Sequence, residues 1–153
     1  MNFIFSEADL RDIGEMHEVR MSVKENKLSN PALISHDDYE HFLTKRGMGW
    51  VCRMNEMIVG FTIVDLVKHN VWALFVRPGF ERQGIGRKLH DIMVDWYFHQ
   101  SASTLWLSTA PGTRAALFYE RAGWTQTGNH GKEIKFQMTW DDWQQRNEGL
   151  QKK

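Results

Sequence analysis

The segment from residue 70 to residue 100 constrains the fold more than any other stretch of the chain. An apolar run over 71–76 is interrupted at Pro78 and Gly79, and a loop containing Gly84 and Gly86 follows. From there apolar side chains recur at helical spacing, which predicts a helix over 85–100 with its apolar stripe at Ile85, Leu89, Ile92, Met93 and Trp96. A strand, a loop and an amphipathic helix in this order predict a helix that packs on a sheet.

The glycine loop is a candidate anion site. The first N–H groups of a helix have no partner inside the helix and carry the positive end of its dipole, and glycines let phosphate oxygens approach them. Arg82, Arg87 and Lys88 add positive charge nearby. The simpler interpretation is that Gly84 and Gly86 only form a tight turn. A dinucleotide fingerprint would need a glycine where Leu89 stands, and a P-loop would need lysine directly after Gly86, so neither pattern fits.

Two motifs resemble the GCN5-related N-acetyltransferase (GNAT) family. The segment 81–86, Glu-Arg-Gln-Gly-Ile-Gly, resembles the Gln/Arg-x-x-Gly-x-Gly/Ala loop that binds acetyl-CoA, with Glu81 in place of Gln or Arg. The segment 112–124 resembles Asn-x-x-Ala-x-x-Phe-Tyr-x-x-x-Gly-Phe, with Gly112 in place of the asparagine. The resemblance covers roughly 49–140 and implies that the loop holds the pyrophosphate of acetyl-CoA through its backbone N–H groups.

The resemblance also implies a fold and a set of site residues. The fold is α/β (α+β): a mixed, mostly antiparallel sheet of about six to seven strands flanked by four helices, with one parallel pair splayed at the cofactor site. Tyr119 occupies the position of the general acid, although Phe118-Tyr119 would otherwise be interpreted as core packing. The expected acetyl-CoA site consists of Leu74, Phe75, Val76, Glu81, Arg82, Gln83, Gly84, Ile85, Gly86, Arg87, Lys88, Gly112, Arg114, Ala115 and Phe118.

The chain is expected to form one domain over 1–153. Within it, 1–48 should supply two helices that form the acceptor wall, 49–140 the cofactor-binding core, and 141–153 a polar tail or short helix. A strand is predicted over 1–5, a helix capped within 6–9 that runs to about Met21, and a second helix capped by Ser35. Strands are predicted over 49–54, 57–68, 71–76 and 104–109, then a helix over 113–122 and a hairpin of 124–129 with 132–140.

The acceptor amine must lose a proton, because a lysine-like amine has a pKa of about 10.4. Glu25, His36, Asp37 and Glu40 lie in the expected acceptor wall, but each is better explained as a solvated or capping side chain, so the sequence does not identify the base. Candidate substrate-binding residues are Glu25, Tyr39, Trp72 and Trp106; the two tryptophans would otherwise belong to the core. The seven histidines show no metal-binding spacing, and no metal is expected.

Composition narrows the partners. Lys+Arg and Asp+Glu number 19 each, so nothing indicates binding to nucleic acid or to an anionic membrane. The single Cys52 lies in a strand pattern and is interpreted as a small core residue. No apolar run has the length of a signal peptide or a spanning helix, and a reducing cytoplasm is the expected location. A homodimer is expected only by analogy with the family.

Three functions therefore follow from the sequence as hypotheses. The first is an N-acetyltransferase that moves the acetyl group of acetyl-CoA to a primary amine of a small molecule or protein. The second is a module of the same fold that binds an acyl-CoA without turnover, and the third is an unrelated nucleotide-binding protein. Binding of acetyl-CoA separates the third hypothesis from the others, and turnover separates the first from the second.

Overall fold

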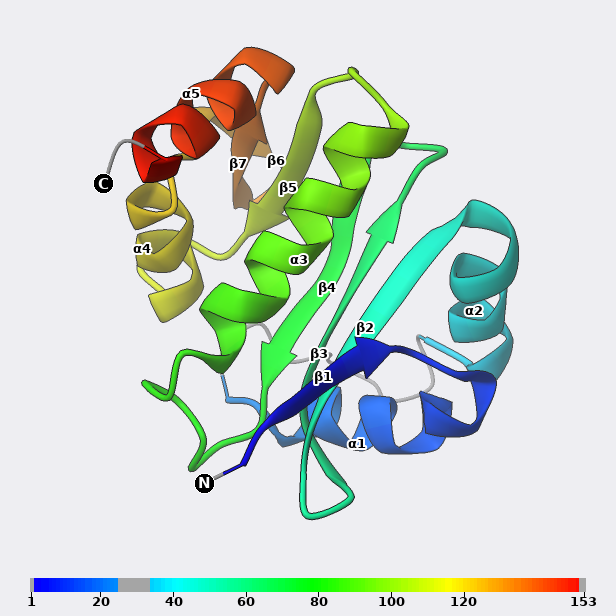
Figure 1. Cartoon of the computed structure of the whole chain (residues 1–153). Coiled ribbons are helices and arrows are strands. Elements are labelled where there is room, and N and C mark those ends of the chain that lie inside the picture. The colour runs from blue at the N-terminus through cyan, green and yellow to red at the C-terminus, as the bar shows by residue number, and fades with distance from the viewer. Residues whose placement is uncertain (1, 25–33, 152–153) are drawn as a thin grey trace.

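The computed structural model describes residues 2–24 and 34–151 and shows a seven-stranded sheet with helices on both faces (Figure 1). The strand order is β1-β2-β3-β4-β5-β7-β6. The strands are β1 (Ile4–Glu7), β2 (Gly47–Met54), β3 (Met57–Asp65), β4 (Asn70–Val76), β5 (Leu105–Thr109), β6 (Thr125–His130) and β7 (Glu133–Met138). The α-helices are α1 (Ile13–Ser22), α2 (His36–His41), α3 (Ile85–Gln100), α4 (Arg114–Arg121) and α5 (Trp140–Gln151).

The sheet is antiparallel except between β4 and β5, which are parallel and joined through α3. The two strands are in register at one position, where Asn70 faces Trp106, whereas β4 pairs with β3 along nearly its whole length. Beyond Asn70 the β5-facing edge of β4 is therefore open toward Val76. The predicted fold class, with its splayed parallel pair, is confirmed.

Helix α3 covers one face of the sheet, together with α4 and α5 (Figure 1). The predicted stripe is buried at Ile85, Leu89 and Met93. The contact is close because β3 has Gly60 beneath the helix: a Cβ there would lie 3.0 Å from Ile85 Cγ2 and 3.2 Å from Leu89 Cδ1. The first turn of α3 therefore packs closely on the sheet at Gly60 of β3.

The opposite face carries α1 and α2, whose apolar side chains pack on β2, β3 and β4. The predicted helix start within 6–9 was partly wrong, because Ser6 and Glu7 belong to β1. Asp9 instead caps a short 3-10 turn, η1 (Leu10–Asp12), with a reciprocal bond from the Asp9 N–H to the side chain of Asp12. A π-helical turn, η3 (Phe42–Arg46), continues α2 into β2.

The residues expected to form a polar tail or a short helix belong mostly to the helix α5, so the described residues contain five α-helices rather than the expected four. Trp143 explains why this polar segment docks on α3. Its ring stacks on Phe98 with the centroids 5.5 Å apart, and its Nε1 donates to Asp95 Oδ1 at 2.8 Å.

Two further predictions concern burial and membranes. Cys52 is fully buried in β2, and burial raises the pKa of its thiol to about 11, as suits a core residue. Among the residues described, no helix has both the length and the apolar character needed to cross a bilayer.

Candidate active site

A cavity of about 550 Å³ lies where the open end of β4 meets the N-terminus of α3 and one side of α4. Leu74 and Val76 contribute from β4, the glycine loop forms one side, and Ala115, Phe118 and Tyr119 contribute from α4. Most of the residues expected to hold acetyl-CoA line this cavity: Leu74, Val76, Glu81, Arg82, Gly84, Ile85, Gly86, Arg87, Arg114, Ala115 and Phe118.

The N–H groups at the start of α3 belong to the glycine loop that forms one side of this cavity. The first intrahelical bond of α3 runs from Lys88 N to Gly84 O, so the N–H groups of residues 85–87 precede the internal ladder. Gly84 has φ +82°, a left-handed conformation that favours glycine. Gly86 is different: a Cβ there would meet Val76 Cγ2 at an ordinary 3.5 Å. Gly84 is therefore required by the backbone, whereas Gly86 leaves room for a ligand.

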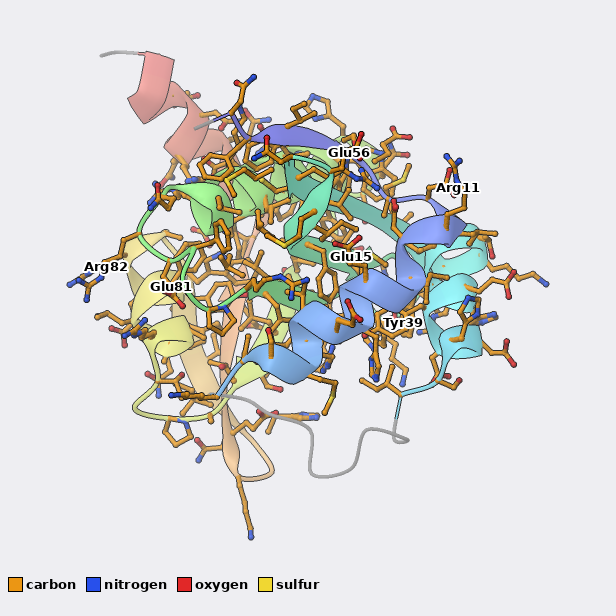
Figure 2. The ribbon with its side chains drawn as sticks, turned by 90° about the horizontal axis from the view of Figure 1, so that it is seen from below. Arg11, Glu15, Tyr39, Glu56, Glu81 and Arg82 are labelled. Carbon is orange, nitrogen blue, oxygen red and sulfur yellow. The ribbon has the colours of Figure 1, made fainter. Side chains whose placement is uncertain are left out.

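Positive charge surrounds the same cavity. Arg82, Arg87, Arg114 and Arg121 line it, and Glu81 is the only acidic side chain among its described lining residues. Both Glu81 carboxylate oxygens accept from Gly79 N, at 3.0 and 3.1 Å, so Glu81 closes the turn before the loop. Arg82 extends outward from the loop (Figure 2). Together with the N-terminus of α3, this surface suits a polyanion such as a pyrophosphate.

A second cavity, of about 580 Å³, lies across β4 and β5 and reaches the C-terminal end of α1. Trp72 and Phe75 of β4, Arg20 of α1 and Glu133 of β7 line it, as does Asn70 at the closed end of the parallel pair. Ser108 of β5 donates its hydroxyl to Glu133 Oε1 at 2.9 Å. Of the described residues that line this cavity, Glu133 is the one with a carboxylate.

The two cavities share Leu74, Ala115 and Tyr119 in their walls. Tyr119 is 6% exposed, and burial raises the pKa of its hydroxyl well above the ordinary value of 10. Its hydroxyl is therefore protonated at neutral pH. These three residues therefore border both cavities.

Tyr119 and Phe118 rest on a buried histidine of α3. His90 lies with its ring centroid 5.5 Å from that of Phe118 and 6.4 Å from that of Tyr119. Its Nε2 accepts from Trp124 Nε1, and its Nδ1 bonds to Asp91 Oδ1, so the ring is neutral with the proton on Nδ1. Burial lowers the pKa of His90 accordingly. Asp91 in turn pairs with Arg146 of α5.

Several predicted site residues do not line the cavity expected of them. Phe75 lines the second cavity instead of the first, while Gln83, Lys88 and Gly112 line neither. Lys88 extends its ammonium over the Phe5 ring at 4.9 Å. Glu25 lies outside the described residues.

The two tryptophans expected in the acceptor pocket separate. Trp72 is in the wall of the second cavity, stacked on Phe42 at 4.2 Å and touched edge-on by Tyr39 at 5.1 Å. Tyr39 itself is buried between α1 and α2 (Figure 2), bonded to His17 Nδ1, and supports the wall without lining it. Trp106 lines neither cavity; its Nε1 donates to Lys68 O at 2.9 Å and fastens the closed end of the β4–β5 pair.

Sequence reasoning missed Arg20 and Glu133. The carbon of the Arg20 guanidinium lies 4.7 Å from the centroid of the Phe75 ring and 5.5 Å from that of Trp72, and within the described residues its Nε and Nη1 are buried without a hydrogen-bond partner. Glu133 comes from the last hairpin. No local sequence pattern marks either residue. The only available signal was that Arg20 lies near the end of a helix expected to form part of the acceptor wall.

Three exposed side chains in α2, those of His36, Asp37 and Glu40, each place a possible metal-ligand atom within 4.8 Å of the others. Exposed acidic groups commonly cluster in this way without an ion. Within the described residues this group lies apart from both cavities, so we assign it no function.

Comparison with protein families gives a match over most of the core. Residues 13–124 match the model described as the acetyltransferase (GNAT) family. The chain is also 27% identical, over 85 residues, to the [Ribosomal protein bS18]-alanine N-acetyltransferase of Escherichia coli (strain K12). That match covers 54% of this chain and 57% of the relative, so it spans little more than half of the relative's length.

Solved structures share the fold at low identity. The ribosomal-protein-S18-alanine N-acetyltransferase of Escherichia coli superposes with a TM-score of 0.70 at 20% identity, covering 90% of this chain and 92% of that one. A GNAT-family acetyltransferase of Staphylococcus aureus Mu50 gives 0.78 at 20% identity, covering 91% and 99%. The PaiA N-acetyltransferase of Thermoplasma acidophilum, in complex with coenzyme A, gives 0.76 at 11% identity, with the same coverage.

Proposed function

Because the chain belongs to the acetyltransferase (GNAT) family, we propose that it is an N-acetyltransferase that moves the acetyl group of acetyl-CoA to a primary amine by direct attack on the thioester. One observation carries the proposal. The two cavities, one basic and one with a carboxylate, meet at Leu74, Ala115 and Tyr119. Two reactants, one in each cavity, would therefore contact the same three residues.

The first cavity supplies what acetyl-CoA needs. The N–H groups of residues 85–87 and the surrounding arginines would hold the phosphates. The pantetheine arm has peptide-like amides, and the open edge of β4 offers unpaired backbone groups to them as a neighbouring strand would. A backbone N–H near Val76 would then stabilise the oxyanion, an effect worth about 3–4 kcal/mol per donor.

The second cavity would bind the acceptor amine and contains the proposed base. Glu133 takes a proton from the ammonium form of the acceptor, directly or through water, and the neutral nitrogen then attacks the thioester to form the C–N bond. The C–S bond then breaks, and the leaving thiolate takes the hydroxyl proton of Tyr119, which the raised pKa keeps in place until then. Tyr119 regains a proton from the acetylated nitrogen, directly or through water, and Glu133 loses its proton to solvent after release of CoA.

Calorimetric titration with acetyl-CoA, beside CoA, ATP and NAD, followed by thiol release with a panel of amines, tests the proposal. Selective binding of acetyl-CoA and amine-dependent thiol release are expected. Binding without thiol release for any amine would favour a non-catalytic acyl-CoA-binding module, and equal binding of ATP would remove the assignment of the glycine loop. The expected homodimer and the expected absence of nucleic-acid and membrane partners stay predictions; light scattering checks the first.

A further inference from the structure

Among the described residues, no ion pair is found for the cation in the second cavity, that of Arg20. Arg20 reaches from the last turn of α1 into a wall formed by Trp72 and Phe75, whose ring centroids lie 5.5 and 4.7 Å from its guanidinium carbon. Its Nε and Nη1 are buried, and among the described residues neither has a hydrogen-bond partner. The aromatic faces attract the positive charge, but they do not replace an oxygen atom as hydrogen-bond acceptor for these N–H groups.

Such an arrangement is costly when the site is empty. A buried charged donor without a partner costs free energy, whereas a guanidinium that meets a carboxylate forms charge-assisted hydrogen bonds. Arginine is suited to this task because its fork is planar and its charge is permanent. The unpaired donors of Arg20 therefore indicate an anion as the missing partner.

A second group in the same cavity requires a hydrogen-bond donor, whereas Arg20 requires an acceptor. The side-chain oxygen of Asn70 is also buried without a partner among the described residues, and it requires a donor. Glu133, in the wall of the same cavity, likewise accepts protons. A ligand that satisfies all three side chains carries both an anionic group and N–H groups.

We infer that the acceptor is a small amine that bears a carboxylate, an amino-acid-like molecule whose carboxylate is bound by Arg20. The inference rests on the proposed function and narrows its acceptor. It separates this chain from an enzyme that acts on the first residue of a protein, because the amine of a peptide N-terminus is followed by an amide instead of a carboxylate.

The test compares matched amines that differ only in the carboxylate. β-Alanine against propylamine, and 4-aminobutyrate against butylamine, vary its distance from the nitrogen, while L-alanine is compared with L-alaninamide and with an alanine-initiated tripeptide amide. For the carboxylated amines that react best, we expect kcat/KM to exceed that of the matched amine without the carboxylate by at least about tenfold. In Arg20→Met this ratio should fall to near one, and Arg20→Lys should retain part of it.

Because the ratio is measured on one preparation, it does not depend on the fraction of a variant that folds. Arg11→Met is the matched control, since the Arg11 side chain is 88% exposed and lies away from both cavities (Figure 2). Equal rates for both members of every pair, a preference for the tripeptide, or a ratio unchanged in Arg20→Met would overturn the inference.

Failure of the proposed function gives a different result. If acetyl-CoA binds but no amine is acetylated, the proposed function fails, and titration of the same pairs into the CoA-loaded protein decides the inference without turnover. Tighter binding of the carboxylated member, abolished in Arg20→Met, supports it; equal binding overturns it.

Discussion

Trp124 Nε1 donates a hydrogen bond to His90 Nε2 across 2.9 Å, in a buried space beneath the helix that carries Tyr119. A protonated imidazole has no lone pair to accept this bond, so the contact requires the neutral form of His90. Nδ1 can then donate to Asp91, which Arg146 holds from α5. The C-terminal helix is thus connected through α3 to the floor of the proposed active site.

The neutral His90 makes stability sensitive to acid. Its pKa is lowered in the folded protein, chiefly by burial, so the unfolded chain binds more protons as the pH falls below the ordinary value of 6.5. Stability is therefore complete above that pH and declines below it, by at most about 1.4 kcal/mol per pH unit. Urea denaturation between pH 5 and 8 should show a decline that is weaker in His90→Gln. The exposed His41→Gln is the control, and an equal decline in His90→Gln would refute the assignment.

Tyr119→Phe should lower kcat at least about tenfold with little change in affinity for acetyl-CoA, because only the proton donor is lost. The raised pKa of Tyr119 means that its hydroxyl does not ionise in the working range, so the loss should be the same from pH 6 to 9. Tyr97→Phe makes the same chemical change at a buried residue that lines neither cavity and should leave kcat near that of the wild type. An unchanged rate in Tyr119→Phe removes Tyr119 from the mechanism.

Substitution of the two loop glycines should separate backbone strain from ligand space. At Gly84, with φ +82°, alanine is strained and should cost about 1 kcal/mol of stability as well as affinity for acetyl-CoA. Gly86→Ala meets only an ordinary contact with Val76, so it should fold normally and still bind acetyl-CoA more weakly. Gly131→Ala, at φ +62° in the β6–β7 hairpin, is the control for strain alone. Thermal unfolding and calorimetry measure the two effects, and full affinity in Gly86→Ala would contradict the loop assignment.

The position of the glycine loop before a helix was predictable because everything that forms it is local. Gly84 and Gly86 lie within one turn of α3, and the apolar period that predicts the helix follows directly. The same holds for the stripe from Ile85 to Met93, whose burial depends only on the helical repeat and on having a sheet beneath it.

The second cavity was not predictable to the same extent, because its walls come from α1, β4, β5 and β7. Trp72 and Trp106 occupy equivalent-looking strand positions, yet a single register, Asn70 opposite Trp106, puts Trp106 at the closed end of the pair. Arg20 becomes a candidate only because the structure shows its donors without partners, and Glu133 only because the structure places it in the wall of the same cavity. The docking of α5 likewise depends on Trp143 meeting Phe98 and Asp95, a contact between distant segments.

Glu133→Gln tests the base on the acceptor side. The amide keeps the shape and can still bond to Ser108, but it cannot take a proton, so kcat/KM at pH 7 should fall by about 100-fold. The deficit should shrink as the pH approaches the amine pKa of about 10.4, because the amine is then already neutral in solution. Glu148→Gln, an exposed residue of α5, is the matched control and should show wild-type rates throughout. A deficit that stays constant across the pH range would assign Glu133 to binding the acceptor, and wild-type rates would leave proton transfer to water alone.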